Sequence, residues 1–535
     1  MTKGRWFGPS RLGGVFVLLF LAVMVLWPLV AVVRRSLVGV GPDRLVEIVS
    51  RGSVRSVLVF TTSQAVLSVI ITLLVGLPIA HALARYDFRG RRSVRALAVV
   101  PFVLPTVVVA TAFDALFDRL GVSLDNSLAA IIAAHVFFNV AVVVRIVGGF
   151  WSRLDRRQVA AARVLGAGPV RAFREITLRQ LVPVLSGAAV LVFLFSFTSY
   201  GVILILGGAD QATIETEIRR YAIFRQEFDV AAVLAMIQVV VVSTLALLSA
   251  RFQRKHSAVA AVRRPTPALA LDSLVRRVHL GLVMLLVIVV IVLPILALVE
   301  RSLVLGDGSY GLNHYRALTT RAQVLPTSPA RALANTLGFA FAAAFVASVV
   351  GVVAAKAVVA GGRLGRLLEF VTLIPLGVSA VTLGFGYLLA FTVLDLRRSI
   401  WLIPIAHAVI GLPFVLASVV PAMRSIDDRL RQAAASLGAS PSAVRRQVEW
   451  PLVRRPVLSG AGFAMAVSIG EFGATSFLSR SSAGFTAPMA VFRLLGRPGT
   501  SLRGQALALS VIIGLLVAVL AALLERTRGD EVTLL

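Results

Sequence analysis

The chain has 535 residues, of which 58% are hydrophobic, a formal net charge of +29 and no cysteine. This apolar content excludes an ordinary soluble protein and indicates an integral membrane protein. The lack of cysteine excludes a disulfide framework, a thiolate metal site and a cysteine nucleophile. Because the arginines fall in short gaps between apolar runs, we expect no nucleic-acid partner.

Apolar runs predict an all-α membrane fold with about twelve transmembrane helices, six in each half. The first run, from Leu12 to Val33, lacks a small-residue cleavage site, so it is expected to be a retained span and not a signal peptide. The runs cover residues 12–33, 57–84, 94–117, 127–150, 182–206, 229–250, 278–299, 332–360, 367–394, 399–422, 457–478 and 504–524. A basic connector, residues 251–277, divides a first transmembrane domain (1–250) from a second (278–535).

The two halves form a parallel repeat. Residues 131–155 align with residues 403–427 without a gap, which pairs His135 with His407 and Asp155 with Asp427. Because the two histidines are equivalent, we favour a structural role in helix packing over metal binding. Six spans in each half give both copies the same orientation.

A bent stretch occurs twice, at about residues 154–180 and 426–452. Each copy has three alanines, then Leu-Gly-Ala, then a proline. Glycine favours a left-handed residue at the end of a helix, and proline favours the first turn of the next, so each stretch is predicted to be helix, bend, helix. The residues that carry this pattern are Ala161, Ala162, Leu165, Gly166 and Pro169 in the first copy and Ala433, Ala434, Leu437, Gly438 and Pro441 in the second.

Arginine placement predicts which side these stretches face. Seven arginines lie between Trp151 and Leu181, and seven lie between Met423 and Pro456. Basic short loops mark the cytoplasm, so both bent stretches and both termini are expected to be cytoplasmic in a multi-pass inner-membrane protein. One such helix alone would suit contact with anionic lipid headgroups. Two equivalent copies favour docking onto another protein.

These stretches resemble the "EAA" loops of the membrane subunits of binding-protein-dependent ABC importers. The alanine pairs and the glycines fall on that pattern, but its glutamate is replaced by Ala160 and Gln432. The resemblance implies a type I importer permease with both halves fused, whose loops couple to a homodimer of ABC ATPase subunits. It also implies an extracytoplasmic solute-binding protein as a second partner.

A finer resemblance, to fused permeases for thiamine and for ferric iron, covers residues 197–201, 206–208 and 211–218. Residues 468–475 are also similar to sulfate and molybdate permeases, so a permease for sulfate, molybdate or polyamine stays an alternative. No lysine follows a glycine, so the chain lacks a phosphate-binding loop. We therefore expect no catalytic residues and no cofactor in this chain, with ATP and Mg²⁺ bound by a separate ATPase.

A different class, an ion-coupled secondary transporter of the major facilitator type, also uses six plus six repeats. Residues 87–92 are similar to the signature motif of that class, but Phe88 replaces its first basic residue and Leu83 stands where a glycine belongs. We favour the importer over this alternative.

Few polar groups lie inside the predicted spans. Glu471 sits between glycines, where it either borders the path of a cationic substrate or binds backbone amides of a loosened helix. Asp114 and Asn139 are further candidates for a substrate path. Prolines and glycines in the third and ninth spans, at positions 101, 105, 375, 377, 384 and 386, predict kinked helices there.

Overall fold

The computed structural model describes residues 10–122, 124, 126–256, 268–372, 374–392, 399–478 and 481–528. Within these ranges the chain forms helices and turns with no β-strand, which confirms the all-α fold. Ten helices in the described ranges are long and apolar enough to cross a bilayer, as expected for a multi-pass membrane protein. Residues 257–267 of the predicted connector lie outside the described part.

Contacts divide the chain into two compact units. Unit 1 comprises Met1–Ile48, Ile218–Val239 and Leu305–Leu535, and unit 2 comprises Val49–Glu217 and Val240–Val304. The first span thus belongs with the later part of the sequence, and the seventh expected span belongs with the earlier part. The units differ in this respect from the two sequence halves, whose domain boundaries stay a prediction.

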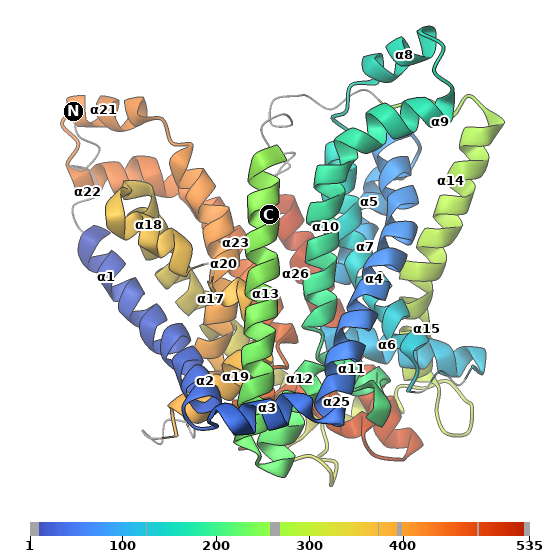
Figure 1. Cartoon of the computed structure of the whole chain (residues 1–535), viewed down its shortest axis with the longest axis vertical. Helices are drawn as coiled ribbons and strands as arrows, with labels where there is room; N and C mark the ends of the chain where they lie inside the picture. The colour runs from blue at the N-terminus through green and yellow to red at the C-terminus, as the bar shows by residue number, and fades with distance from the viewer. Residues whose placement is uncertain are drawn as a thin grey trace. The chain divides into compact units, whose positions relative to one another are not determined.

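Unit 1 is built mainly from the second half of the sequence. Its elements are α1 (Ser10–Leu21), η1 (Ala22–Leu26), α2 (Trp27–Leu37), η4 (Arg220–Arg225), α16 (Asn313–Ala317), α17 (Pro329–Ala360), α18 (Gly362–Val371), η7 (Ile374–Gly377), α19 (Ala380–Ala390), α20 (Leu402–Arg424), α21 (Asp428–Ser436), α22 (Pro441–Val444), η9 (Arg445–Glu449), α23 (Trp450–Gly470), α24 (Thr475–Leu478), α25 (Ala487–Leu495) and α26 (Thr500–Arg528). Within it, α17, α20 and α23 pack together (Figure 1).

Unit 2 is built mainly from the first half of the sequence. Its elements are α4 (Gly52–Arg85), α5 (Arg91–Val103), α6 (Thr106–Leu120), α7 (Leu128–Trp151), α8 (Arg156–Val164), α9 (Pro169–Ala172), η2 (Phe173–Leu178), α10 (Arg179–Phe197), α11 (Gly201–Leu206), η3 (Ala209–Gln211), α14 (Leu274–Val287), η6 (Ile288–Val292) and α15 (Leu293–Leu303). Three helices cross a boundary between units: α3 (Pro42–Ser50), α12 (Ile214–Arg219) and α13 (Phe228–His256). Within unit 2, α4, α7 and α10 pack together.

Ten of the twelve expected spans contain a helix among the described residues that is long and apolar enough to cross a bilayer, and the third and ninth do not. In the third, α5 and α6 meet at an angle of 107°. The ring of Pro105 disfavours a helical conformation for Leu104, which is extended with φ −67° and ψ 138°. In the ninth, α18 and α19 are separated by the tight turn η7, which contains Pro375. The kinks predicted from proline are confirmed, although Pro101 lies inside α5 without breaking it.

Equivalent polar contacts confirm the internal repeat. On α4, the hydroxyl of Thr61 accepts a hydrogen bond from the amide of Ile214 at 3.1 Å. On α17, the hydroxyl of Thr336 accepts one from the amide of Ala487 at 2.8 Å. Each bond satisfies a free amide at the start of a helix, so both halves anchor the helix after their fifth span in the same way.

Each half also has a place where two helices approach closely at a glycine, and the two places are equivalent in the repeat. A Cβ at Gly76 of α4 would lie 2.8 Å from the Cβ of Val143 on α7. A Cβ at Gly351 of α17 would lie 2.6 Å from Cγ1 of Val415 on α20. Since Val143 and Val415 are 272 residues apart, the same small-against-branched contact sets the helix spacing in both halves.

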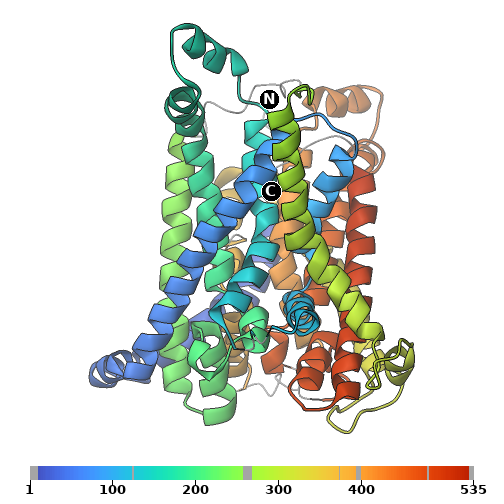
Figure 2. The ribbon, with the colours of Figure 1, turned by 90° about the vertical axis from the view of Figure 1, so that its right-hand side faces the viewer.

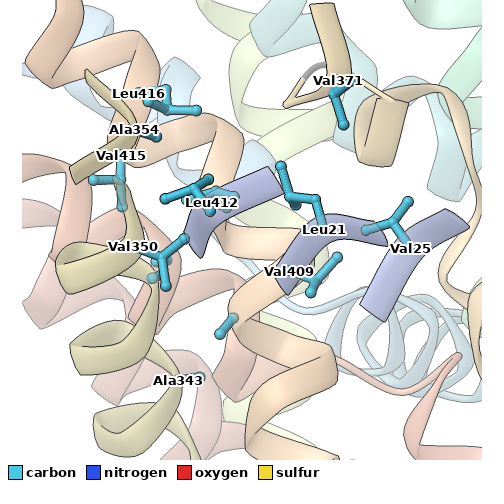
Figure 3. Packing of buried hydrophobic residues seen from close by; sticks show 14 of the residues in the cluster. Leu21, Val25, Ala343, Val350, Ala354, Val371, Val409, Leu412, Val415 and Leu416 are labelled. Atoms are coloured by element: carbon cyan, nitrogen blue, oxygen red, sulfur yellow. The ribbon is translucent and has the colours of Figure 1, made fainter. Parts of the chain in front are cut away.

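Each unit has an apolar core. In unit 1, Figure 3 shows Leu21 and Val25 of the first span beside Val409 and Leu412 of α20. In unit 2, buried residues of α4, α6, α7 and α11 cluster with residues of α14, η6 and α15. Other long apolar side chains stay exposed, such as Phe345 at 71%, as expected for helices whose outer faces contact lipid.

Candidate functional site

The first bent stretch forms an elbow of two short helices, here called the first elbow (residues 155–178). Asp155 caps α8 by accepting a hydrogen bond from an amide of its first turn at 2.9 Å. The helix ends at Gly166, whose φ of +88° favours glycine. The amide of Ala167 donates to the carbonyl of Ala162 at 2.9 Å, which closes the helix end. Pro169 then begins α9.

The second elbow (residues 427–450) repeats this geometry 272 positions later. Asp427 caps α21 with a bond of 2.9 Å. Gly438 has φ +83°, and the amide of Ala439 donates to the carbonyl of Ala434 at 3.0 Å. Pro441 begins α22. The helix, bend, helix prediction is therefore confirmed in both copies.

Both elbows present apolar side chains at their tips. Leu165 is 86% exposed and Leu437 is 89% exposed, and Val164 beside the first is 88% exposed. In Figure 1 and Figure 2 the α8 and α9 elbow extends beyond the end of α10 in the same unit. The predicted residues Ala161, Gly166, Pro169, Ala433, Gly438 and Pro441 are also exposed, and Ala162 and Ala434 are half-buried. Such exposed apolar tips are suited to a protein partner.

The second elbow is fixed by an ion-pair network on Arg431. This side chain is only 6% exposed, and its Nε donates to Oε1 of Glu449 at 2.7 Å. Its Nη1 donates to Oδ1 of Asp428 at 2.6 Å. Because Glu449 lies in the turn that leads into α23, the network ties α21 to the base of a membrane span.

The first elbow has no such network at the equivalent positions. Val159 stands in place of Arg431, and Thr177 stands in place of Glu449. A bond of 2.8 Å from Gln180 to Gln158 joins α8 to α10 instead, and no side chain of α8 is buried. This difference was not predicted from the sequence, although the charges of Arg431 and Glu449, which the first copy lacks, signal it.

Glu471 lies in the break between α23 and α24, with its carboxylate 3% exposed. Oε1 accepts from the amide of Ala474 at 2.7 Å, and Oε2 accepts from the amide of Thr475 at 3.0 Å. Nε2 of His407 is 3.0 Å from Oε2, and its Nδ1 is 2.7 Å from the hydroxyl of Ser468. Of the two interpretations of Glu471, the structure shows the binding of freed backbone amides, and the buried His407 joins α20 to this break.

The two other candidates for a substrate path lie in unit 2. Asn139 is buried on α7, and its Nδ2 donates to the hydroxyl of Ser196 on α10 at 3.2 Å. Gln64 of α4 donates to the carbonyl of the same serine at 2.9 Å. Asp114 is half-buried on α6. A role in a substrate path stays a prediction for Asp114, Asn139 and Glu471.

Two helical bundles built on one repeated plan, each with an exposed elbow, define a polytopic membrane protein of two related halves. The chain belongs to the family of binding-protein-dependent transport system inner membrane components, whose model matches residues 72–256 and again residues 347–528. It is thus a fused permease of the kind used by binding-protein-dependent ABC importers. This assignment replaces the major facilitator alternative.

Individual relatives cover most of the chain. The thiamine transport system permease protein ThiP of Brucella abortus (strain 2308) is 27% identical over 493 residues, which are 88% of this chain and 87% of that protein. ThiP of Escherichia coli (strain K12) is 26% identical over 504 residues, 88% of this chain and 89% of that protein. The sulfate transport system permease protein CysT of Salmonella typhimurium is 30% identical over 243 residues, 43% of this chain and 87% of that protein.

Proposed function

We propose that this permease carries thiamine into the cell, driven by ATP hydrolysis on separate ATPase subunits and supplied by an extracytoplasmic binding protein. The observation that supports thiamine as the substrate is the length of chain over which the relatives align. Relatives described as thiamine permeases align with both halves, over 88% of the chain. The sulfate relative aligns with 43% of it, so it supports the class of permease more than the substrate.

The elbows are proposed to be the contacts for the two ATPase subunits, which would bind ATP and Mg²⁺. Their support is the pair of equivalent helix ends with exposed Leu165 and Leu437 at the tips. The residues at the position of the family's glutamate, Ala160 and Gln432, are exposed and uncharged. The contact therefore rests on apolar burial, and not on an ion pair from that position. The excess of arginine in these loops supports a cytosolic location for the elbows and for both termini.

Uptake of labelled solute tests the substrate. The chain would be produced with the binding protein and ATPase encoded beside it, in cells that lack their own thiamine uptake. ATP-dependent accumulation of thiamine, with no accumulation of ferric iron or sulfate, is expected. Accumulation of iron or sulfate without thiamine would refute the substrate while leaving the permease class intact.

A charge placed on the elbow tips tests the ATPase contact. Leu165→Asp with Leu437→Asp puts carboxylates into the proposed apolar contact, and we expect the ATPase to be lost on co-purification. Val122→Asp is the matched control, because Val122 is also an exposed apolar residue, 46% exposed, in the loop after α6. Full retention of the ATPase by the double variant would exclude the elbow tips as its contact.

A further inference from the structure

A basic cavity of about 330 Å³ opens beside the second elbow, within unit 1. Its polar lining includes Lys356 near the end of α17 and Arg445, Arg446 and Glu449 of η9, together with Arg431 of α21 and Ser442 of α22. A single water needs roughly 10–15 Å³ of such space. The cavity therefore has room for a charged group much larger than water.

The charges that line this cavity do not balance. Glu449 and Asp428 both bind Arg431, so this network carries one net negative charge. Lys356 and Arg445 are half-buried and Arg446 is exposed, and none of the three has an ion pair within the described part of the chain. The three unpaired cations thus outnumber the net negative charge of that network, and the cavity stays basic.

The first half of the chain fills the equivalent place with aromatic rings. His81 stands in place of Lys356, 275 residues earlier, which is the shift that relates Thr61 to Thr336. Phe173 stands in place of Arg445. The ring of Trp151 lies 5.0 Å from that of His81 and 6.5 Å from that of Phe173, centroid to centroid. Arg174 corresponds to Arg446, so two of the three cations, Lys356 and Arg445, are specific to the second half.

We propose that this cavity binds a phosphate group. Arginine presents a planar fork of donors that matches phosphate oxygens, and lysine adds a point charge. Trp450 also lines the cavity and is 51% exposed. Tryptophan is enriched where a membrane meets water, and basic pockets between membrane helices bind lipid headgroups. An anionic phospholipid headgroup therefore suits the site, and a free phosphate compound would use the same donors.

A bound phosphate has a consequence for the second elbow. Arg445 and Arg446 lie in the same turn as Glu449, which ties α21 to α23 through Arg431. A phosphate that neutralises Arg445, Arg446 and the nearby Lys356 of α17 removes repulsion between these cations and holds the turn in place. The second elbow then responds to the phosphate, whereas beside the first elbow His81 and Phe173 replace two of the cations. This inference does not depend on which solute the permease carries.

Native mass spectrometry of the full chain, stripped of lipid and then titrated, tests the proposal. Phosphatidylglycerol and phosphatidylcholine are the lipid probes, and inorganic phosphate is the soluble probe. The test variant is Lys356→Met with Arg445→Gln. The matched control is Arg454→Gln with Arg455→Gln, which removes two charges from exposed positions on α23 outside the cavity.

Preferential retention of phosphatidylglycerol by the unmodified chain is expected. Its affinity should fall about fivefold for each cavity charge removed, so roughly 25-fold in the test variant, with little change in the control. Lys356→Arg with Arg445→Gln keeps one of the two charges and should therefore recover about fivefold of that loss. Binding of inorganic phosphate with the same variant dependence and no lipid preference would assign the site to a free phosphate compound. Equal losses in the test and control variants, or no binding of either probe, would overturn the proposal.

Discussion

Removal of the Arg431 side chain should loosen the second elbow, because it breaks the ion pair that joins α21 to the turn before α23. Arg431→Val leaves the carboxylate of Glu449, 16% exposed, without its partner. Breaking a buried pair costs about 3–5 kcal/mol. The largely exposed Asp428 loses little interaction free energy, because water replaces Arg431 beside it. Glu449 also regains some water, which lowers the cost further. We therefore expect about 2 kcal/mol, which is roughly a 30-fold rise in local opening of α21.

The first elbow suggests the compensating change. It has Val159 and Thr177 at the positions of Arg431 and Glu449, so Glu449→Thr added to Arg431→Val removes the unpaired charge. The double variant should recover most of the loss, because replacing both members of a buried pair is far cheaper than removing one.

Hydrogen exchange of the amides in residues 428–444 measures the effect directly. We expect faster exchange at α21 in Arg431→Val, near-normal exchange in the double variant, and no change at α8, which serves as an internal control. Unchanged exchange in Arg431→Val would mean that the ion pairs do not hold the elbow. Exchange at α21 that is even faster in the double variant than in Arg431→Val would refute the argument from the unpaired carboxylate.

Two further predictions concern topology and helix packing. Because the chain has no cysteine, Leu165→Cys and Leu437→Cys each create a single thiol. An impermeant maleimide should label both in inside-out vesicles and neither in right-side-out vesicles, and the reverse pattern would place the elbows outside. Gly384→Leu should lower uptake severely while the chain still inserts, because a Cβ at Gly384 would lie 2.7 Å from the Cα of Ala474. Uptake equal to that of the unmodified chain would show that this contact is dispensable.

Features set by local chemistry could be predicted from the sequence. Gly166 and Gly438 need a left-handed backbone, and the prolines that follow suit a first helical turn, so both elbows were predicted without knowledge of any packing. Pro105 and Pro375 likewise marked the third and ninth spans as kinked. The size of the bend, 107° in the third span, did not follow from proline alone.

Features that depend on which helices meet could not be predicted. In the sequence Arg431 is one of many arginines predicted to be cytosolic. Its ion pair with Glu449 becomes evident only when α21 is placed against the turn before α23. Glu471 had two interpretations, and the choice required the positions of two amides and of His407, 64 residues earlier. A helix that is apolar all round carries no sequence signal of the face it buries, so the grouping of α1 and α2 with α17 to α20 also required the structure.

That grouping bears on how the protein is made. Leu21 and Val25 are completely buried in a core shared with α17 and α20, yet about 300 residues of chain separate them from α17. At a synthesis rate of roughly 5–20 residues per second, the first span waits on the order of 15–60 s before its packing partners leave the ribosome. This span is therefore among the last to find its final neighbours, and during that interval it needs lipid or an insertion factor against its apolar side.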